Sequence, residues 1–307
     1  MDKGLQISVI GAGLMGHGIA LTFARAGHSV TITDPHKETL ASAPTRIAES
    51  LRSLGSTQDE ICGTLGRIAL GEGISSAVAA SDVVVEAVPE KLELKQKVFS
   101  EVEEHAPVNT ILASNTSVIQ ITKIMANLTH RSRALGTHWW NPPHMIPLVE
   151  VVKTEWTDPA VAERMSSLLA QAGKTPVIVE KDVPGFIGNR LQHALWREAI
   201  SLVENGICSA EAVDTVIKAS FGQRLAVLGP LENADLVGTD LTLDIHENVL
   251  FDLESRREPS PYLEKLVKGG RLGMKSGEGF RRWTKDEADA VRERVGRHLT
   301  MIKTILN

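Results

Sequence analysis

A glycine-rich turn close to the N-terminus constrains the fold of this chain more than any other feature. Residues 5–10, LQISVI, form a short apolar run rich in β-branched residues, and the sequence GAGLMG follows at 11–16. An apolar helical pattern then leads to Gly27, and a second apolar run at 29–33 ends on Asp34. A buried strand, a GxGxxG turn, a helix, a second strand and an acid in this order are typical of a Rossmann βαβ unit. We therefore expect an α/β fold that begins with a doubly wound sheet.

The same unit predicts a dinucleotide ligand. The first glycine permits the tight turn, the second lets a pyrophosphate approach the backbone, and the third lets helix and strand pack closely. The helix N-terminus then offers free N–H groups and a partial positive charge to the phosphates. Asp34 can accept hydrogen bonds from ribose hydroxyls and would repel a 2′-phosphate, and no arginine follows at 35–37, so NAD is favoured over NADP. A glycine turn that binds no phosphate is the alternative. The predicted cofactor-binding residues of this unit are Gly11, Gly13, Leu14, Met15, Gly16 and Asp34.

Length and patterning predict two domains. The chain has 307 residues, and short apolar runs predict further strands at 83–88, 110–113, 133–137, 148–152 and 176–179. Residues 38–75 are interpreted as a helical excursion that ends in a polar stretch. A break at KDVPG, residues 181–185, precedes a largely helical half. We therefore expect a Rossmann domain over 1–184 and an all-helical domain over 185–307.

Charge and composition argue against several classes of function. The formal net charge of −5 disfavours nucleic acid as a main partner, because phosphate binding needs a basic face. No apolar run reaches the ~18 residues of a membrane span, and no signal peptide precedes the first strand. We therefore expect a cytoplasmic protein without a membrane partner. Cys62 and Cys208 lack metal-ligand spacing and are interpreted as reduced thiols, and no metal site is predicted.

The stretch LGTHWWNPPHMIPLVEVV, residues 135–152, carries the strongest candidate for chemistry. His138 ends the fifth predicted strand, and Glu150 lies in the next apolar run after a proline-stiffened loop. An alcohol dehydrogenase needs a group that takes the hydroxyl proton, and histidine suits this role with an unperturbed pKa of about 6.5. A neighbouring carboxylate would fix its tautomer and stabilise the imidazolium. A histidine merely packed among aromatics is the alternative, which the upstream Rossmann unit disfavours.

Other residues of this stretch have weaker assignments. His144 is the rival histidine, but it has no acid at a comparable position, so we expect at most a substrate contact. Trp139 is interpreted as a pocket wall and Trp140 as a core residue, and a packing role for both remains open. Asn141 is grouped with them as a possible substrate contact.

Polar residues also follow the third and fourth predicted strands. Glu90 and Lys95 lie at the start of a helix, where an acid suits the helix dipole, and an ordinary solvated helix start is the alternative. SNTS at 114–117 follows the fourth strand. Small polar residues at the carboxyl end of a parallel strand face the ligand crevice of a doubly wound sheet. A helix N-cap by Thr116 or Ser117 is an equally good interpretation.

Several motifs together resemble the 3-hydroxyacyl-CoA dehydrogenase family, and the resemblance covers nearly the whole chain. The motifs are GAGLMG at 11–16, VVVEAVPE at 83–90, SNTS at 114–117, HWWNPP at 138–143, LVEVV at 148–152, KDVPGFIGNRL at 181–191 and GRLGMKSGEGF at 270–280. The resemblance implies that His138 is the catalytic base, Glu150 its partner and Ser117 a ligand of the substrate hydroxyl. Asn189 would hold the substrate oxygen or the nicotinamide near the base. NAD contacts are implied for the glycine turn, Asp34, Glu90, Lys95 and Asn115, and a homodimer is implied through the helical domain.

The chain also departs from the acyl-CoA members. These usually carry two phenylalanines in place of Trp139 and Trp140, and a lysine-bearing helical hairpin that contacts CoA phosphates. Here no lysine occurs between Glu38 and Glu90. The sequence NPPHMIPLVEV, with His144, is similar to a branch that acts on small substrates without CoA, which includes carnitine, gulonate/λ-crystallin and pyridine-carboxylate dehydrogenases. Within this branch, NPPH, KDVPGF and KSGEG most resemble the pyridine-carboxylate dehydrogenases. A non-catalytic, crystallin-like NAD-binding protein is the alternative from another class.

Overall fold

An eight-stranded sheet forms the first half of the protein in the computed structural model, which describes residues 4–306. The strands are β1 (Gln6–Ile10), β2 (Ser29–Thr33), β3 (Ile68–Leu70), β4 (Val83–Glu86), β5 (Ile111–Ser114), β6 (Ala134–Trp139), β7 (Leu148–Val152) and β8 (Thr175–Val179). Their order is β3-β2-β1-β4-β5-β6-β7-β8, and neighbours are parallel except for the antiparallel pair β6 and β7. The expected doubly wound α/β fold is confirmed.

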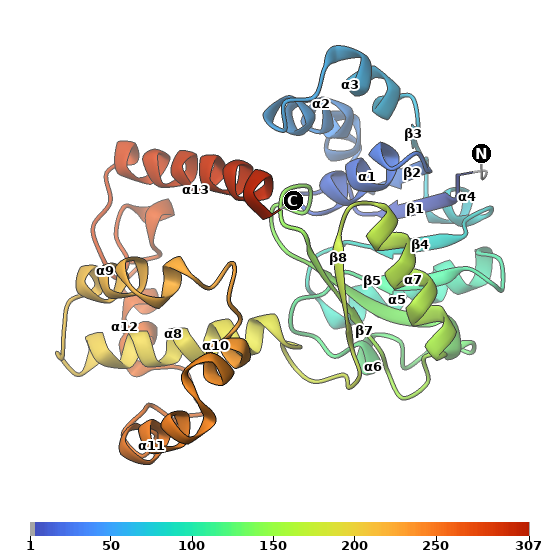
Figure 1. Ribbon diagram of the computed structural model, residues 1–307. Helices are drawn as coiled ribbons and strands as arrows, with labels where there is room; N and C mark the ends of the chain where they lie inside the picture. The colour runs from blue at the N-terminus through green and yellow to red at the C-terminus, as the bar shows by residue number, and fades with distance from the viewer. Residues whose placement is uncertain (1–3, 307) are drawn as a thin grey trace. The chain divides into compact units, whose positions relative to one another are not determined.

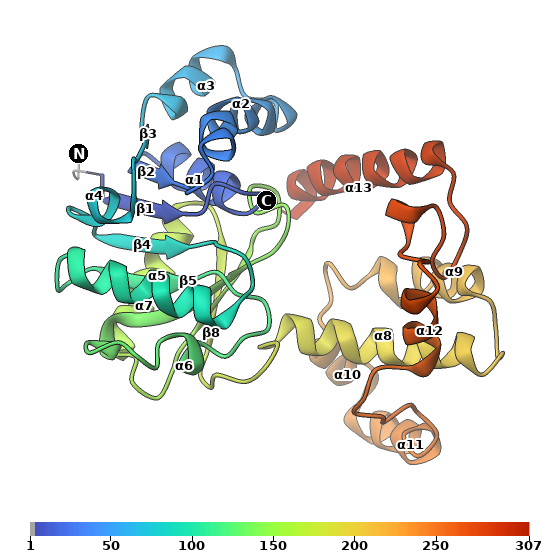
Figure 2. The same ribbon diagram turned by 180° about the vertical axis from the view of Figure 1, so that it is seen from behind.

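Helices cover both faces of this sheet, with α1 and α7 on one face and α5 and α6 on the other (Figures 1 and 2). The helices of this half are α1 (Gly16–Arg25), α2 (Lys37–Ser53), α3 (Gln58–Leu65), α4 (Ile74–Val78), α5 (Leu92–His105), α6 (Ile121–Ile124) and α7 (Pro159–Gln171), with a 3-10 turn η1 (Arg131–Arg133). Phe23 and Met165 belong to one buried cluster, and Phe99 and Ile121 to the other. Strands buried on both faces explain why their sequences are nearly continuous apolar runs.

The segment expected as one helical excursion, 38–75, is more complex. It contains α2, α3, the short strand β3 and the start of α4. β3 has three residues and pairs with β2 at the edge of the sheet, where Ala69 and Leu70 remain exposed. A strand this short and this exposed lacks the apolar run by which the other strands can be recognised.

A topological switch point lies between β1 and β4. β1 pairs with β2 on one side and with β4 on the other, so the connections leave β1 in opposite directions. Ligands of doubly wound sheets bind in the crevice outside the carboxyl ends of the strands at such a point. Here the glycine turn follows β1, and β4 ends on Glu86.

The second half is helical, as expected. Its elements are α8 (Gly188–Glu204), α9 (Ala210–Ala219), η2 (Phe221–Gln223), α10 (Pro230–Val237), α11 (Thr239–Val249), α12 (Pro261–Lys268), η3 (Met274–Ser276) and α13 (Lys285–Leu306). The contacts divide the chain into units 1–190 and 191–307, so the first residues of α8 belong to the sheet unit. The expected boundary lies six residues earlier, between 184 and 185. Over residues 4–306, no helix is long and apolar enough to cross a membrane.

Candidate active site

The predicted His138–Glu150 pair is present and lies on adjacent strands. His138 in β6 and Glu150 in β7 are directly opposite each other in the antiparallel register. The Nδ1 atom of His138 lies 2.7 Å from Oε2 of Glu150, and both side chains are buried. Antiparallel neighbours opposite each other are close enough for their side chains to bond. The loop 140–147 thus brings two residues that are twelve positions apart in the sequence within hydrogen-bonding distance.

The second oxygen of Glu150 binds the start of α8. Oε1 accepts hydrogen bonds from the backbone N–H groups of Ile187 and Gly188, at 2.8 and 3.0 Å. The residue before them, Phe186, is buried and has a positive φ of 49°, which aims these two groups at the carboxylate. Burial opposes ionisation of Glu150, but the bonds from His138, Gly188 and Ile187 outweigh burial and lower the pKa of Glu150. Glu150 is therefore held in its charged form beside the imidazole of His138.

This geometry fixes the tautomer of His138. A carboxylate can only accept, so the Nδ1 atom carries the proton that it donates to Glu150. The Nε2 atom is then the basic nitrogen. The rings of Trp140 and Phe186 flank the imidazole, with centroids at 5.3 and 5.6 Å. A buried base with its basic nitrogen fixed by a second group is the arrangement that proton abstraction from an alcohol requires.

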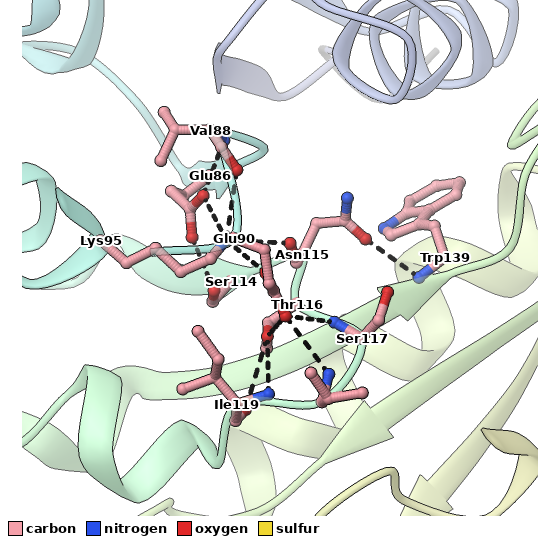
Figure 3. Close-up of polar contacts among 11 residues, drawn as sticks. Glu86, Val88, Glu90, Lys95, Ser114, Asn115, Thr116, Ser117, Ile119 and Trp139 are labelled. Carbon is pink, nitrogen blue, oxygen red and sulfur yellow. Dashed lines mark hydrogen bonds and ion pairs between the residues drawn. The ribbon is translucent and has the colours of Figure 1, made fainter. Parts of the chain in front are cut away.

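The loop that carries Ser117 follows β5 and contacts the start of α8, which also binds Glu150. Ser117 is exposed, and its carbonyl oxygen accepts a hydrogen bond of 2.8 Å from Nδ2 of Asn189 at the start of α8. Asn115 connects this loop to β6, because its Oδ1 atom accepts a bond from the backbone N–H of Trp139 at 3.2 Å (Figure 3). The segment 115–117 is therefore bonded to β6 through Asn115 and to the start of α8 through Ser117.

Glu90 holds this loop in place. One carboxylate oxygen, Oε1, accepts from the Thr116 hydroxyl at 2.5 Å and from the N–H groups of Ser117 and Val118 at 3.0 and 3.3 Å (Figure 3). Burial opposes ionisation, but the Thr116 hydroxyl, the Lys95 charge and the two backbone donors together lower the pKa of Glu90. Glu90 is exposed, as an ordinary solvated helix start would leave it, but its carboxylate also binds the neighbouring loop.

Replacement of Glu90 should affect turnover more than cofactor binding. In Glu90→Ala the three donors lose their acceptor and Ser117 becomes mobile, so we expect kcat to fall about 10- to 100-fold. The Kd for NADH should change by less than about threefold. Glu90→Gln keeps an acceptor oxygen and should retain most activity, and Glu93→Ala, in the exposed first turn of α5, is the control. Loss of NADH affinity with kcat retained would instead mean that Glu90 binds the cofactor directly.

Lys95 has a different place from the one expected. Its side chain is 0% exposed, and its Nζ atom lies 2.8 Å from Oε1 of Glu86 and 3.2 Å from the carbonyl oxygen of Asn115. Glu86 also accepts bonds from the Ser114 hydroxyl at 2.6 Å and from the Val88 N–H at 2.7 Å. A fully enclosed ammonium leaves no surface for a cofactor contact, so the expected NAD contact of Lys95 is not supported. The Lys95–Glu86 pair instead joins the carboxyl ends of β4 and β5.

Glu86 is the residue of this network that the sequence interpretation missed. It is 0% exposed and ends a strand in which the other residues are valines. The signal was an acid within VVVEAV, because a buried carboxylate requires a charged or hydrogen-bonding partner. Burial raises the pKa of Glu86 against the opposing effect of the Lys95 charge.

The glycine turn has the shape that a pyrophosphate needs. A Cβ atom on Gly16 would collide with the carbonyl oxygen of Gly11, so the helix starts in close contact with the turn. A Cβ atom on Gly13 would meet nothing within 4 Å, so this side of the turn is open to a ligand. Asp34 accepts bonds from the N–H groups of Ala12 and His36, both at 2.8 Å, and has further lone pairs for ribose hydroxyls. The residues present therefore fit a dinucleotide.

The two tryptophans have the reverse of their expected places. Trp139 is 2% exposed and packs edge-on against Phe23 in the core, so its interpretation as a pocket wall is wrong. Trp140 is partly exposed, lies beside His138, and has its indole over Gly188, where a Cβ atom would lie 2.5 Å away. Successive side chains of a strand point to opposite faces, so Trp140 shares the face of His138 and Trp139 does not.

His144 lies against α1. Its ring is 6.4 Å from that of His17, and a Cβ atom on Gly18 would lie 3.2 Å from its Nδ1 atom. Asn141, the remaining predicted substrate contact, is exposed in the same loop. Burial, together with the charges of His17 and Lys174, lowers the pKa of His144 to about 4.

This shift predicts an effect on acid stability. The unfolded chain binds a proton on His144 near pH 6.5, while the folded protein binds it only near pH 4, so folding stability falls as the pH decreases between these values. His144→Gln should lose less stability over this range than the wild type, by about 2–4 °C in melting temperature. Thermal melts at pH 7 and pH 4.5 measure the difference, with the exposed His36→Gln as control. Parallel curves for wild type and His144→Gln would contradict the assignment.

A Rossmann sheet with a dinucleotide turn after β1 and a buried histidine–carboxylate pair on the adjacent strands β6 and β7 fits an NAD-dependent dehydrogenase that acts on CH–OH groups. Comparison with known proteins identifies the family within this class. Residues 6–183 match the family described as 3-hydroxyacyl-CoA dehydrogenase, NAD binding domain, and residues 185–283 match its C-terminal domain. The chain belongs to the 3-hydroxyacyl-CoA dehydrogenase family.

Two kinds of relative are similar to the chain over most of its length. It is 35% identical to the 5-formyl-3-hydroxy-2-methylpyridine 4-carboxylate 5-dehydrogenase of Mesorhizobium japonicum, over 98% of both chains. It is 40% identical to the mitochondrial hydroxyacyl-coenzyme A dehydrogenase of Homo sapiens, over 90% of both chains. A crystal structure of a 5-formyl-3-hydroxy-2-methylpyridine 4-carboxylic acid 5-dehydrogenase, described as an NAD+-dependent dismutase, superimposes with a TM-score of 0.91 at 34% identity over 99% of both chains. The (S)-3-hydroxybutyryl-CoA dehydrogenase of Ralstonia eutropha gives 0.77 at 30% identity, over 92% of this chain and all of the other.

Proposed function

We propose that the protein oxidises, or in reverse forms, an alcohol on a small carboxylate substrate that carries no coenzyme A. The observation that carries this proposal is the TM-score of 0.91 over 99% of both chains with a pyridine-carboxylate dehydrogenase, against 0.77 with a CoA-dependent enzyme. The α2–α3 region supports it as well. That region has no lysine between Glu38 and Glu90, and the guanidinium of Arg46 binds backbone carbonyls instead of facing a CoA phosphate.

The side chains suggest how the reaction would proceed. Bound NAD+ would supply the hydride acceptor. The Nε2 atom of His138 would take the hydroxyl proton, and Glu150 would stabilise the resulting imidazolium through the bond to Nδ1. Ser117 and Asn189, which are bonded to each other, would hold the substrate oxygen near the base. In the reductive direction the imidazolium would return the proton to the carbonyl oxygen.

A substrate panel tests this proposal. We expect free hydroxy acids, pyridine carboxylates and polar alcohols or aldehydes to include a substrate whose kcat/KM exceeds that of acetoacetyl-CoA by at least about 100-fold. The second candidate is a 3-hydroxyacyl-CoA substrate, which the 40% identity to the human enzyme favours. A fast reaction with acetoacetyl-CoA at micromolar KM would establish that candidate and overturn the proposal. NADH binding without turnover of any panel member would indicate a non-catalytic protein.

We also propose that the protein is a cytoplasmic homodimer that associates through its helical unit. Over residues 191–302, Leu266 and Ala288 are the buried apolar side chains, while large apolar residues of α10, α11 and the loop after them are exposed. Leu231, Leu236 and Phe251 are 80%, 72% and 82% exposed. Apolar surface on this scale usually marks an interface. Cys62 and Cys208 are free cysteines, as a reducing compartment would keep them.

The oligomeric state is directly measurable. Sedimentation should give twice the mass of one chain for the wild type and for Glu247→Gln, an exposed change on α11. Leu231→Glu combined with Phe251→Glu places charges in the apolar surface, so we expect dimer dissociation to become at least about 100-fold more favourable. A monomeric wild type at micromolar concentration would overturn the proposed dimer.

A further inference from the structure

Arg46 of α2 binds the carbonyl side of the glycine turn. Its Nη2 atom donates to the carbonyl oxygens of Ala12 and Thr39, at 2.6 and 2.8 Å. Its Nη1 atom donates to the carbonyl oxygen of Gly13 at 3.3 Å. The side chain is partly buried. One guanidinium therefore binds two successive peptide units of the turn and ties both to the first turn of α2.

These two peptide units are the ones whose N–H groups face the ligand side. The carbonyls of Ala12 and Gly13 share their peptide planes with the N–H groups of Gly13 and Leu14, and in a trans peptide the N–H points away from the carbonyl oxygen. Within residues 4–306, neither N–H group donates to the protein backbone. The side of Gly13 where a Cβ would stand is open. Arg46 thus occupies one side of the turn, and two free donors lie on the other.

A cation bound to a peptide carbonyl changes what the peptide can do. Hydrogen bonds in a chain polarise one another, so a guanidinium on the oxygen makes the N–H group of the same peptide a stronger donor. The bonds are charge-assisted, and the planar fork restricts the orientation of both peptides. The positive charge also adds to that of the α1 N-terminus. All three effects favour an anion on the open side of the turn.

The positive charge beside the carbonyl oxygens of the glycine turn is that of Arg46. His17 is the neighbouring basic group, with its Nδ1 atom 2.9 Å from the carbonyl oxygen of Gly13 and 3.3 Å from Nη1 of Arg46. Burial lowers the pKa of His17, and the Arg46 charge lowers it further against the bond to Gly13. Arginine keeps its charge at every relevant pH. At neutral pH a neutral His17 therefore lies beside a charged Arg46.

We propose that Arg46 is a positioning residue for the cofactor pyrophosphate, which acts through the peptide units Ala12–Gly13 and Gly13–Leu14. It sets the orientation and donor strength of the two N–H groups and supplies a full charge behind them. A glycine turn alone offers only partial charges, so this protein reinforces its dinucleotide site from a helix more than thirty residues further along the chain. The arginine is accordingly unavailable to a second, exogenous phosphate.

Ligands with and without a pyrophosphate separate this role from simple packing. In Arg46→Met we expect the Kd of NADH and of ADP-ribose to rise about 10- to 30-fold, which is the scale of a lost charge-assisted bond. The Kd of adenosine should change by less than about twofold. Arg46→Lys keeps the positive charge but not the planar fork of the guanidinium, so its affinity for NADH should lie between those of the wild type and Arg46→Met. Arg52→Met, an exposed change on the same helix, is the matched control.

Two further measurements make the outcome independent of catalysis. Amide hydrogen exchange at residues 11–16 of the ligand-free protein should be faster in Arg46→Met and Arg46→Lys than in the wild type. The NADH affinity of the wild type should fall more steeply with ionic strength than that of Arg46→Met. Equal losses for adenosine and ADP-ribose, or unchanged NADH affinity in either variant, would overturn the proposal. Arg46→Lys carries the test if Arg46→Met does not fold.

Discussion

Replacement of His138 by glutamine should lower kcat by about 10²–10⁴-fold, the usual contribution of a general base. The side chain lies beside Glu150 in the buried register pair of β6 and β7, and its Nε2 atom is the basic nitrogen of the pair. Glutamine has similar length and can still bond to the carboxylate, so the fold should persist. The Kd of NADH should remain within about threefold of the wild type, because the dinucleotide turn belongs to other strands. Stopped-flow turnover and NADH fluorescence titration measure the two quantities.

His144→Gln is the matched control for this substitution. His144 lies in the loop that follows β6, and its contacts are with α1 rather than with Glu150. If His138 is the base, His144→Gln should leave kcat within a few-fold of the wild type. Comparable losses of kcat in both variants would contradict the assignment. A His138→Gln variant with wild-type kcat would contradict it more directly, and would point to a different proton acceptor.

The sequence made the elements of the dinucleotide half predictable because each buried strand is a short apolar run. It also located His138 and Glu150, since one ends a strand and the other lies in the next run. The antiparallel register that places them directly opposite was not predictable, because a parallel crossover is the rule elsewhere in this sheet. β3 escaped detection, since three residues at an exposed edge carry no periodic signal.

The side chains around the pair show why the finer assignments failed. Trp139 and Trp140 could have been ordered correctly from the two-residue period of a strand, given that His138 faces the site. Lys95 was different. Its enclosure depends on Glu86, Ser114 and Asn115, which come from two other strand ends. No local pattern reports contacts of that kind, so the sequence offered no check on the NAD contact that the family resemblance implies for Lys95.

Glu150→Gln should lower kcat by about 10³- to 10⁴-fold, although the residue itself need not touch the substrate. In the wild type one carboxylate oxygen accepts from His138 and the other from Ile187 and Gly188. A glutamine has one acceptor oxygen for these three donors. If that oxygen stays with the two backbone groups, the amide NH₂ faces Nδ1 of His138. The imidazole must then carry its proton on Nε2, where it can no longer act as a base.

The same substitution should change the dependence of stability on pH. Because its bonds lower the pKa of Glu150 below the ordinary value of 4.5, the folded protein keeps this carboxylate charged at pH values where the unfolded chain protonates it. The stabilisation is complete above that ordinary value and is lost as the pH falls through the lower, folded value. The difference in unfolding free energy between wild type and Glu150→Gln should therefore be constant from pH 7 to about 5 and shrink in more acidic solution.

Two variants separate the role of Glu150 from that of its surroundings. Glu180→Gln removes an exposed carboxylate that pairs with Lys153, so it should leave kcat and stability nearly unchanged. Glu150→Asp keeps the charge on a shorter side chain that cannot bond both His138 and the start of α8. If the tautomer of His138 decides the activity, Glu150→Asp should retain more activity than Glu150→Gln. If the bonds to Ile187 and Gly188 decide it, the two variants should have similar activity. Equal kcat in wild type and Glu150→Gln would mean that the buried pair serves the sheet and not the reaction.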